Sequence, residues 1–232
     1  MRSDALLVRR VAFGDTDVIV TILSRERGLL SAIARGARRS ARRFPALEPM
    51  HLLGVTFDER PLSELATLAE AQIVRPRMEL VGDLDRLEAA GVALRWVRRA
   101  SPPHAPEPEV WSEINELLDQ LDAPELAAAP RTLLAESGLR LLVGVGWGLS
   151  LEQCVVCGKP CAGGAAGVDA ARGGLVCRSC GGARTVLRGE RRRRLVAAAS
   201  GAGSAGTLDP SDAVVALELI EAALAAHGGV SS

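Results

Sequence analysis

The stretch ALLVRRVAFGDTDVIVTILSRERGLLSAIARG, residues 5–36, predicts three short β-strands in succession. Its apolar runs are separated by the turn-forming pairs Gly-Asp at 14–15 and Arg-Gly at 27–28. In the middle run, DVIVTILS, the alternate residues from Val18 to Ile22 are apolar, and so are most of the residues between them. Both faces of this strand are therefore largely apolar, which is typical of a strand in a small closed barrel.

Two further segments extend the strand pattern. MHLLGVTFDE, residues 50–59, is a fourth strand candidate, and LSELATLAEAQIV, residues 62–74, would suit either a strand or a helix. We interpret the second segment as a fifth strand, because a set of four would leave one edge unpaired. Five short strands in about 75 residues predict an OB-like barrel, with a β-sandwich fragment as the alternative.

From residue 78 onward the hydrophobic period becomes helical. Helices are expected over residues 78–100, 109–121, 130–147 and 211–227. The composition of GAGSAG, residues 201–206, is typical of a flexible linker. The predicted fold class is α+β, with an α-helical middle and C-terminal domain that a cysteine-bearing loop interrupts.

These boundaries predict three domains. An OB-like nucleic-acid-binding barrel is expected over residues 1–77, and a helical domain over 78–150 together with 183–232. Residues 151–182 form the expected insertion, which resembles a zinc finger.

All five cysteines lie in this insertion. Cys154 and Cys157 form one C-x-x-C pair, and Cys177 and Cys180 form a second pair after nineteen intervening residues. This spacing is typical of a tetrahedral zinc site with four thiolate ligands, while disulfide bonds or an iron–sulfur centre stay open as alternatives. Cys161 is expected to be a bystander, since four ligands already complete the coordination shell.

A completed shell predicts a structural zinc ion, because catalytic zinc keeps one position open for water. Its expected role is to organise a loop too rich in glycine to bury a core of its own. The sequence also lacks a P-loop and a defensible Ser/His/Asp cluster. The chain is therefore not expected to be an enzyme.

The densest positive segment is RGARRSARRF, residues 35–44. No acidic residue lies between Glu26 and Glu48, so these arginines lack nearby carboxylates in the sequence. A solvated loop is one interpretation, but guanidinium groups match phosphate geometry, and the loops of OB barrels commonly bind nucleic acids. The predicted DNA contacts are Arg35, Arg38, Arg39, Arg42 and Arg43.

Two further features complete this hypothesis. The barrel region holds only three aromatic residues, Phe13, Phe44 and Phe57, too few for an extensive base-stacking platform. Binding is therefore expected to be electrostatic, independent of sequence and indifferent to strandedness. For a second cluster, RGERRRRL at residues 188–195, the solvated face of a helix is one interpretation, and its role stays open.

The order of these segments resembles the family of the bacterial recombination mediator RecO. The resemblance rests on residues 5–39, on FPALEPMHLLGVTF and LATLAEAQIV, and on LSLEQCVVCGKP and ARGGLVCRSC around the cysteines. It covers about residues 4–185.

Membership of this family implies a DNA-binding accessory protein of RecF-pathway repair. Such proteins bind single- and double-stranded DNA and anneal complementary strands. They engage the single-stranded-DNA-binding protein and, with RecR, help to load RecA. The family's basic loop maps onto Arg35, Arg38 and Arg39, while Arg42 and Arg43 extend it by position only.

The resemblance does not identify which residues here contact the single-stranded-DNA-binding protein. The family's contact for the tail of the single-stranded-DNA-binding protein lies in its helical domain, where residues 81–150 here carry six basic and eleven acidic side chains. No residues are assigned to that contact. The N-terminus lacks a signal-peptide core, so a cytoplasmic, nucleoid-associated protein is expected. The alternative is a zinc-stapled protein–protein interaction scaffold that does not bind DNA.

Overall fold

The computed structural model describes residues 2–40, 42–44, 47–58, 65–161, 164–201 and 206–228. The contacts within the chain group it into two compact units, residues 1–124 and residues 125–232. The division into three domains that the sequence predicts stays a prediction.

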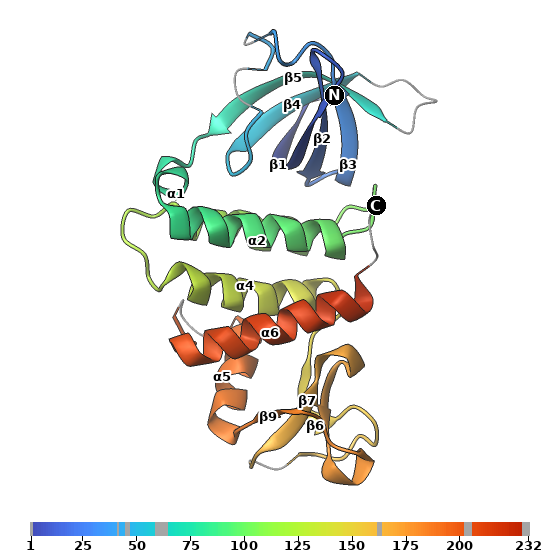
Figure 1. The fold of residues 1–232 in the computed structure, drawn as a ribbon, viewed down its shortest axis with the longest axis vertical. Coiled ribbons are helices and arrows are strands. Elements are labelled where there is room, and N and C mark those ends of the chain that lie inside the picture. The colour runs from blue at the N-terminus through green and yellow to red at the C-terminus, as the bar shows by residue number, and fades with distance from the viewer. Residues whose placement is uncertain are drawn as a thin grey trace. The chain divides into compact units, whose positions relative to one another are not determined.

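The first unit contains a closed barrel with the strand order β1-β2-β3-β5-β4 (Figure 1). Its strands are β1 (Arg2–Phe13), β2 (Asp17–Ser24), β3 (Gly28–Ala34), β4 (Leu52–Asp58) and β5 (Ala66–Arg75). Neighbouring strands are antiparallel except β3 and β5, which pair in parallel. The predicted five-stranded OB-like barrel is confirmed, including the ambiguous fifth strand.

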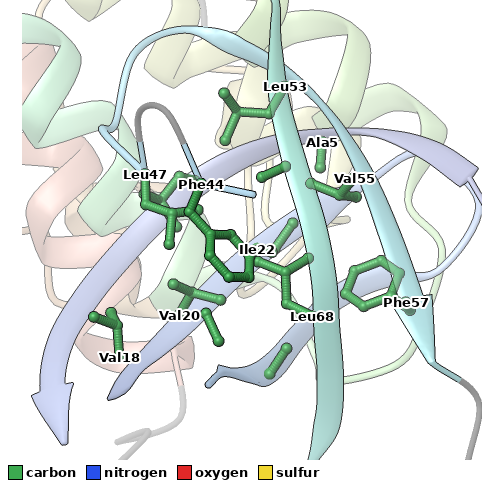
Figure 2. Close-up of a cluster of buried hydrophobic side chains, with 14 of the residues drawn as sticks. Ala5, Val18, Val20, Ile22, Phe44, Leu47, Leu53, Val55, Phe57 and Leu68 are labelled. Atoms are coloured by element: carbon green, nitrogen blue, oxygen red, sulfur yellow. The ribbon is translucent and has the colours of Figure 1, made fainter. Parts of the chain in front are cut away.

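The barrel interior is a continuous apolar core, shown in Figure 2. The alternating residues of β2, Val18, Val20 and Ile22, point into it, which is the pattern that period-2 alternation predicts. Phe44 and Leu47 come from the segment between β3 and β4 and are also buried in this core. The basic stretch therefore ends on a side chain that anchors it to the barrel.

The helices of this unit are α1 (Met78–Gly82), α2 (Leu84–Ala100) and α3 (Pro108–Leu121). The prediction of one continuous helix over residues 78–100 is wrong, because the chain is extended at Asp83. The Asp83 carboxylate accepts a hydrogen bond from the backbone N–H of Arg86 at 3.0 Å. Aspartate is favoured at the N-cap, the residue just before the first turn of a helix. α2 therefore begins after Asp83 as a separate helix.

Arg77 joins the barrel to α3 through a buried guanidinium. The side chain is fully buried, and its Nη1 donates to the backbone carbonyl of Met50 at 2.6 Å. Its Nε donates to Oδ1 of Asp119 at 2.9 Å, and its Nη2 donates to Oδ1 of Asn115 at 3.2 Å. A buried charge needs such partners, because removing one partner of a buried pair costs about 3–5 kcal/mol.

His51 belongs to the same junction, and acid is expected to weaken it. Its Nδ1 accepts a hydrogen bond from the backbone N–H of Arg77 at 3.0 Å. Burial, followed by the nearby Arg77 guanidinium, lowers the pKa of His51. The unfolded chain therefore takes up this proton first, so the contribution of His51 to stability is complete above about pH 6.5 and is lost as the pH falls from there.

Urea unfolding measured between about pH 7.5 and pH 5 tests this expectation. The free energy of unfolding should fall less steeply with acid in a His51→Asn variant, whose side chain keeps an acceptor but does not titrate. Equal slopes for the variant and the original chain would show that His51 does not carry the effect.

The turn between β2 and β3 packs against the connection between α2 and α3. Gly28 has a φ of +66°, and a Cβ there would lie 1.9 Å from the carbonyl oxygen of Ala105. The backbone N–H of His104 donates to the carbonyl of Leu29 at 2.8 Å. The connection between α2 and α3 therefore covers this end of β3, and the basic stretch follows the other end, about 20 Å away at 3.3 Å per residue.

The second unit combines three helices with a four-stranded sheet of order β6-β8-β7-β9. The strands are β6 (Ser150–Cys154), β7 (Ala166–Asp169), β8 (Gly174–Val176) and β9 (Thr185–Leu187), and the helices are α4 (Pro130–Gly144), α5 (Gly189–Ser200) and α6 (Pro210–His227). Short 3₁₀ turns occupy η1 (Ala170–Arg172) and η2 (Arg178–Cys180). No helix among the described residues combines the length and the apolar character needed to cross a bilayer.

The cysteine loop is expected to be too rich in glycine to bury a core of its own, yet the small sheet around it contributes buried apolar side chains. Leu151, Val168, Leu175 and Leu187, one from each strand of the small sheet, are all buried. Glycine serves the close packing here, because a Cβ at Gly174 would lie 2.2 Å from the carbonyl oxygen of Ser150. The sheet thus spans residues 150–187, which extends beyond both ends of the expected insertion.

The second arginine cluster is solvated only in part, because Arg188 and Arg193 are exposed and the other three arginines are partly or fully buried. Arg191 and Arg194 on α5 both form ion pairs with Asp212 on α6, whose side chain is fully buried. Arg192 is buried, and its Nη2 donates to the carbonyl of Cys161 at 2.8 Å. These three arginines hold α5 against α6 and against the cysteine loop.

Candidate nucleic-acid interface and metal centre

The predicted DNA-contact residues follow β3 directly and are all exposed. Arg35 is the first residue after the strand, and Arg38, Arg39, Arg42 and Arg43 follow it. The backbone N–H of Arg38 donates to the carbonyl of Thr16 at 3.0 Å, in the turn between β1 and β2. The start of the basic stretch is therefore fixed to the neighbouring turn of the barrel.

Asp17 makes the second attachment. Its Oδ1 accepts hydrogen bonds from the backbone N–H of Gly36 at 2.8 Å and from the hydroxyl of Thr16 at 2.9 Å. The bond from Gly36, then the bond from Thr16 and the charge of Arg35, hold the pKa of this carboxyl below its usual range. The sequence indicates Asp17 only as part of a turn motif, because its partner lies nineteen residues further along the chain.

The five arginines differ in how their side chains are held. Arg43 folds back, with Nη2 donating to the carbonyl of Arg35 at 3.0 Å and its guanidinium lying 5.4 Å from the Phe44 ring centroid. Arg38 donates from Nη1 to the carbonyl of Asp15 at 3.2 Å. Within the described ranges, none of the five forms an ion pair with a carboxylate. Their charges are thus available to an anion.

The four predicted metal ligands converge at one end of the small sheet. Cys154 ends β6, Cys177 directly precedes η2, and Cys180 is the last residue of η2. The four sulfur atoms, including that of Cys157, lie within 4.8 Å of one another, and the Cys157–Cys177 distance is 3.8 Å. A tetrahedron with metal–sulfur bonds of about 2.3 Å has edges of about 3.8 Å, so the donor set fits a tetrahedral metal ion.

The chemistry of the thiols agrees with this geometry. The backbone N–H of Cys177 donates to the Cys154 sulfur at 3.4 Å, and this bond is the main cause that lowers the pKa of Cys154 to about 6. Hydrogen bonds with Cys177 and then Cys157 raise the pKa of Cys180 to about 12. The pKa of Cys154 is thus lowered while that of Cys180 is raised, so the four thiols do not ionise together. A cation bound among the sulfurs would favour the thiolate at all four positions, and the thiolate is the form of cysteine that binds metals.

Cys161 lies outside this group. The cluster of potential ligands in the described residues contains only the other four cysteines. The Cys161 sulfur lies 4.0 Å from the carbonyl oxygen of Lys159, and its backbone N–H donates to the carbonyl of Glu152. Its position makes Cys161 a suitable internal control for the metal site.

Comparison with known families accounts for nearly the whole chain. Residues 1–77 match the family model described as recombination protein O N terminal, and residues 81–231 match recombination protein O C terminal. The chain belongs to the RecO family. A role in DNA repair and recombination follows from this RecO membership.

Individual RecO proteins are similar to this chain over more than two thirds of their own length. A protein of Anaeromyxobacter sp. (strain K), named DNA repair protein RecO, is 40% identical over 177 residues, which are 75% of this chain and 68% of that protein. Its namesake in Myxococcus xanthus (strain DK1622) is 38% identical over 183 residues, 77% of this chain and 71% of its own. The one in Geobacter metallireducens is 33% identical over 181 residues, 78% of this chain and 72% of its own.

Proposed function

We propose that this RecO chain is a DNA-binding recombination mediator of the RecF pathway that acts without catalysis of its own. It binds single- and double-stranded DNA, anneals complementary strands and, with RecR, helps RecA to load onto DNA coated by the single-stranded-DNA-binding protein. Its place of action is the nucleoid. The observation that carries this proposal is the row of exposed arginines from Arg35 to Arg43, which have no ion-pair partner among the described carboxylates.

Two features support phosphate as the ligand of this row. Guanidinium groups donate in pairs to phosphate oxygens, so arginines that lack a carboxylate partner among the described residues suit a nucleic-acid backbone. The row also starts at the end of β3 opposite Gly28, the residue that packs against the connection between α2 and α3. The five arginine side chains are exposed there, so a phosphate backbone can reach them from solvent.

We further propose that the metal is zinc and that its role is structural. Cys154, Cys157, Cys177 and Cys180 would hold it, and it would supply a four-way cross-link within the small sheet. The four ligands leave no open position for a reacting water. The DNA-binding arginines Arg35–Arg43 belong to the other compact unit, so metal and DNA contacts are separate assignments.

One observation favours the alternative of a protein–protein scaffold. Val155 and Val156, between two of the cysteines, and Val186 on β9 are exposed apolar side chains of the second unit. Such side chains suit a protein partner. A protein partner on the second unit is compatible with DNA binding by the first unit. The scaffold alternative is therefore distinct only if the arginines of the first unit bind no DNA.

Two assays separate these functions. In a gel shift with a ~30-mer at ~50 mM salt, a mediator binds the DNA, whereas a scaffold does not. Annealing of complementary strands coated with the single-stranded-DNA-binding protein is then followed with and without this chain. We expect the chain to accelerate annealing, and a chain that binds no DNA in the first assay would refute the proposed function.

A further inference from the structure

The aromatic side chains of the protein differ sharply in exposure. The chain has three phenylalanines, three tryptophans and no tyrosine, and all six lie within the described residues. Phe44 and Phe57 are 5% and 3% exposed and belong to the barrel core, where Figure 2 shows both rings. Phe13 is 52% exposed, and it is the single exposed ring of the six.

Phe13 lies on the outer face of the barrel. It pairs with Asp17, and Val11, two residues earlier, pairs with Ile19 of β2. Ile19 in turn pairs with Ile33 of β3. The intervening β2 residues point into the core, so Phe13, Val11 and Ile19 share the opposite face. We call these three residues the outer stripe.

Folding does not account for the exposure of this stripe. Val11 is 40% exposed and Phe13 more so, and both lie at the end of β1 where the chain turns toward β2. Apolar surface left in water adds nothing to the stability of the fold, and exposed apolar side chains that lie together on one face suit a contact with a partner.

Three arginines lie near the outer stripe, together with the carboxylates of Asp15 and Asp17. Arg9 lies on the same strand face, two residues before Val11. Arg35 follows β3 beside Asp17, and Arg38 donates to the carbonyl of Asp15 in the turn after Phe13. The Asp17 carboxylate lies opposite Phe13, but it already accepts two hydrogen bonds from the protein. An anionic partner with flat apolar groups matches this surface.

We infer that the Phe13 ring is a stacking platform for an unpaired nucleobase of single-stranded DNA or RNA, held by phosphate contacts to Arg35 and Arg38. This inference rests on the proposed function and adds strand preference to it. A base in a duplex is covered on both faces by its neighbours, whereas an unpaired base offers a free face to an aromatic ring. The barrel should therefore prefer single strands, in place of the indifference to strandedness that the count of aromatic residues predicts.

The test replaces the ring and keeps the charges. A Phe13→Leu variant should bind a ~30-mer of thymidine more weakly, by about 5- to 150-fold, which is the range for loss of one base–aromatic stack. Binding to a duplex of the same length should change by less than about twofold. The slope of log affinity against log salt should stay the same, because no phosphate contact is removed.

Three controls make the result specific. Val74→Ala removes another exposed apolar side chain from the same barrel and should leave both affinities unchanged. A strand of abasic nucleotides keeps the phosphates without the bases, so the variant and the original chain should bind it equally. Phe13→Trp should restore the preference for single strands, since tryptophan also stacks.

The outcomes separate this inference from the proposed function. If the original chain binds DNA but Phe13→Leu keeps the same ratio of single-strand to duplex affinity, the stacking role is refuted and the arginine assignment stands. If the original chain binds neither form, the proposed function itself fails. Equal losses on thymidine and abasic strands would assign Phe13 to the structure of the loop, which also overturns the inference.

Discussion

Replacing Arg35, Arg38 and Arg39 together by alanine is expected to reduce the affinity for single-stranded DNA by on the order of 10²–10³-fold at ~50 mM salt. Each phosphate contact to a single strand contributes roughly 0.7 to the slope of log affinity against log salt, so the slope should become shallower by about 2. The loss should be the same for all sequences, because phosphate contacts carry no base information. The three side chains are exposed, so folding should be preserved.

The matched control is the triple replacement of Arg172, Arg184 and Arg193 by alanine. These arginines are exposed on the second unit, and their removal changes the net charge by the same amount. Fluorescence titration at several salt concentrations then compares the two variants. An equal loss in both would mean that net charge, and not the row of arginines after β3, governs DNA binding.

Loss of the metal is expected to unfold the small sheet of the second unit. Structural zinc sites in peptides bind with apparent free energies of about 10–16 kcal/mol, more than a three- or four-residue strand can replace. Cys154→Ser should therefore lose the stoichiometric zinc measured by elemental analysis and should expose the sheet to proteolysis between residues 150 and 187. A chelator strong enough to remove zinc should produce the same cleavage in the original chain.

Cys161→Ser is the control for this experiment, since it removes a thiol from the same segment outside the sulfur cluster. It should retain one zinc ion per chain and resist the protease. Retention of zinc by Cys154→Ser, or its loss from Cys161→Ser, would show that the ligand set is assigned wrongly. DNA binding by the first unit can be followed in the same samples.

The sequence predicts the barrel well because its signals are local. Alternating residues such as Val18, Val20 and Ile22 specify a strand by themselves, and the turn pairs mark its ends. The fifth strand carries no such local signal, and only the need to pair an edge identifies it. The hydrophobic pattern hides the break at Asp83 because α1 and α2 together keep one helical period, although a capping aspartate is visible in the sequence.

A site is easier to predict from the sequence when its residues lie close together along the chain. The cysteine spacing contains its own geometry, so the sequence alone names four ligands that lie together in the fold. The role of Arg191 and Arg194 depends on Asp212, which lies on another helix, and no spacing rule connects them. The three phenylalanines look alike in the sequence, and only the closed barrel separates the exposed ring of Phe13 from the two buried ones.

The buried guanidinium of Arg77, which joins the barrel to α3, affects where the protein can be cut into fragments. The N-terminal family model ends at residue 77, yet the side chain of Arg77 has its carboxylate partner at Asp119. A fragment cut at that boundary would keep the cation and discard the group that neutralises it. Residues 1–124 retain both, together with the Ala105 carbonyl against which Gly28 packs. A fragment that keeps the contacts of the barrel intact therefore has to extend well beyond residue 77, where the N-terminal family model ends.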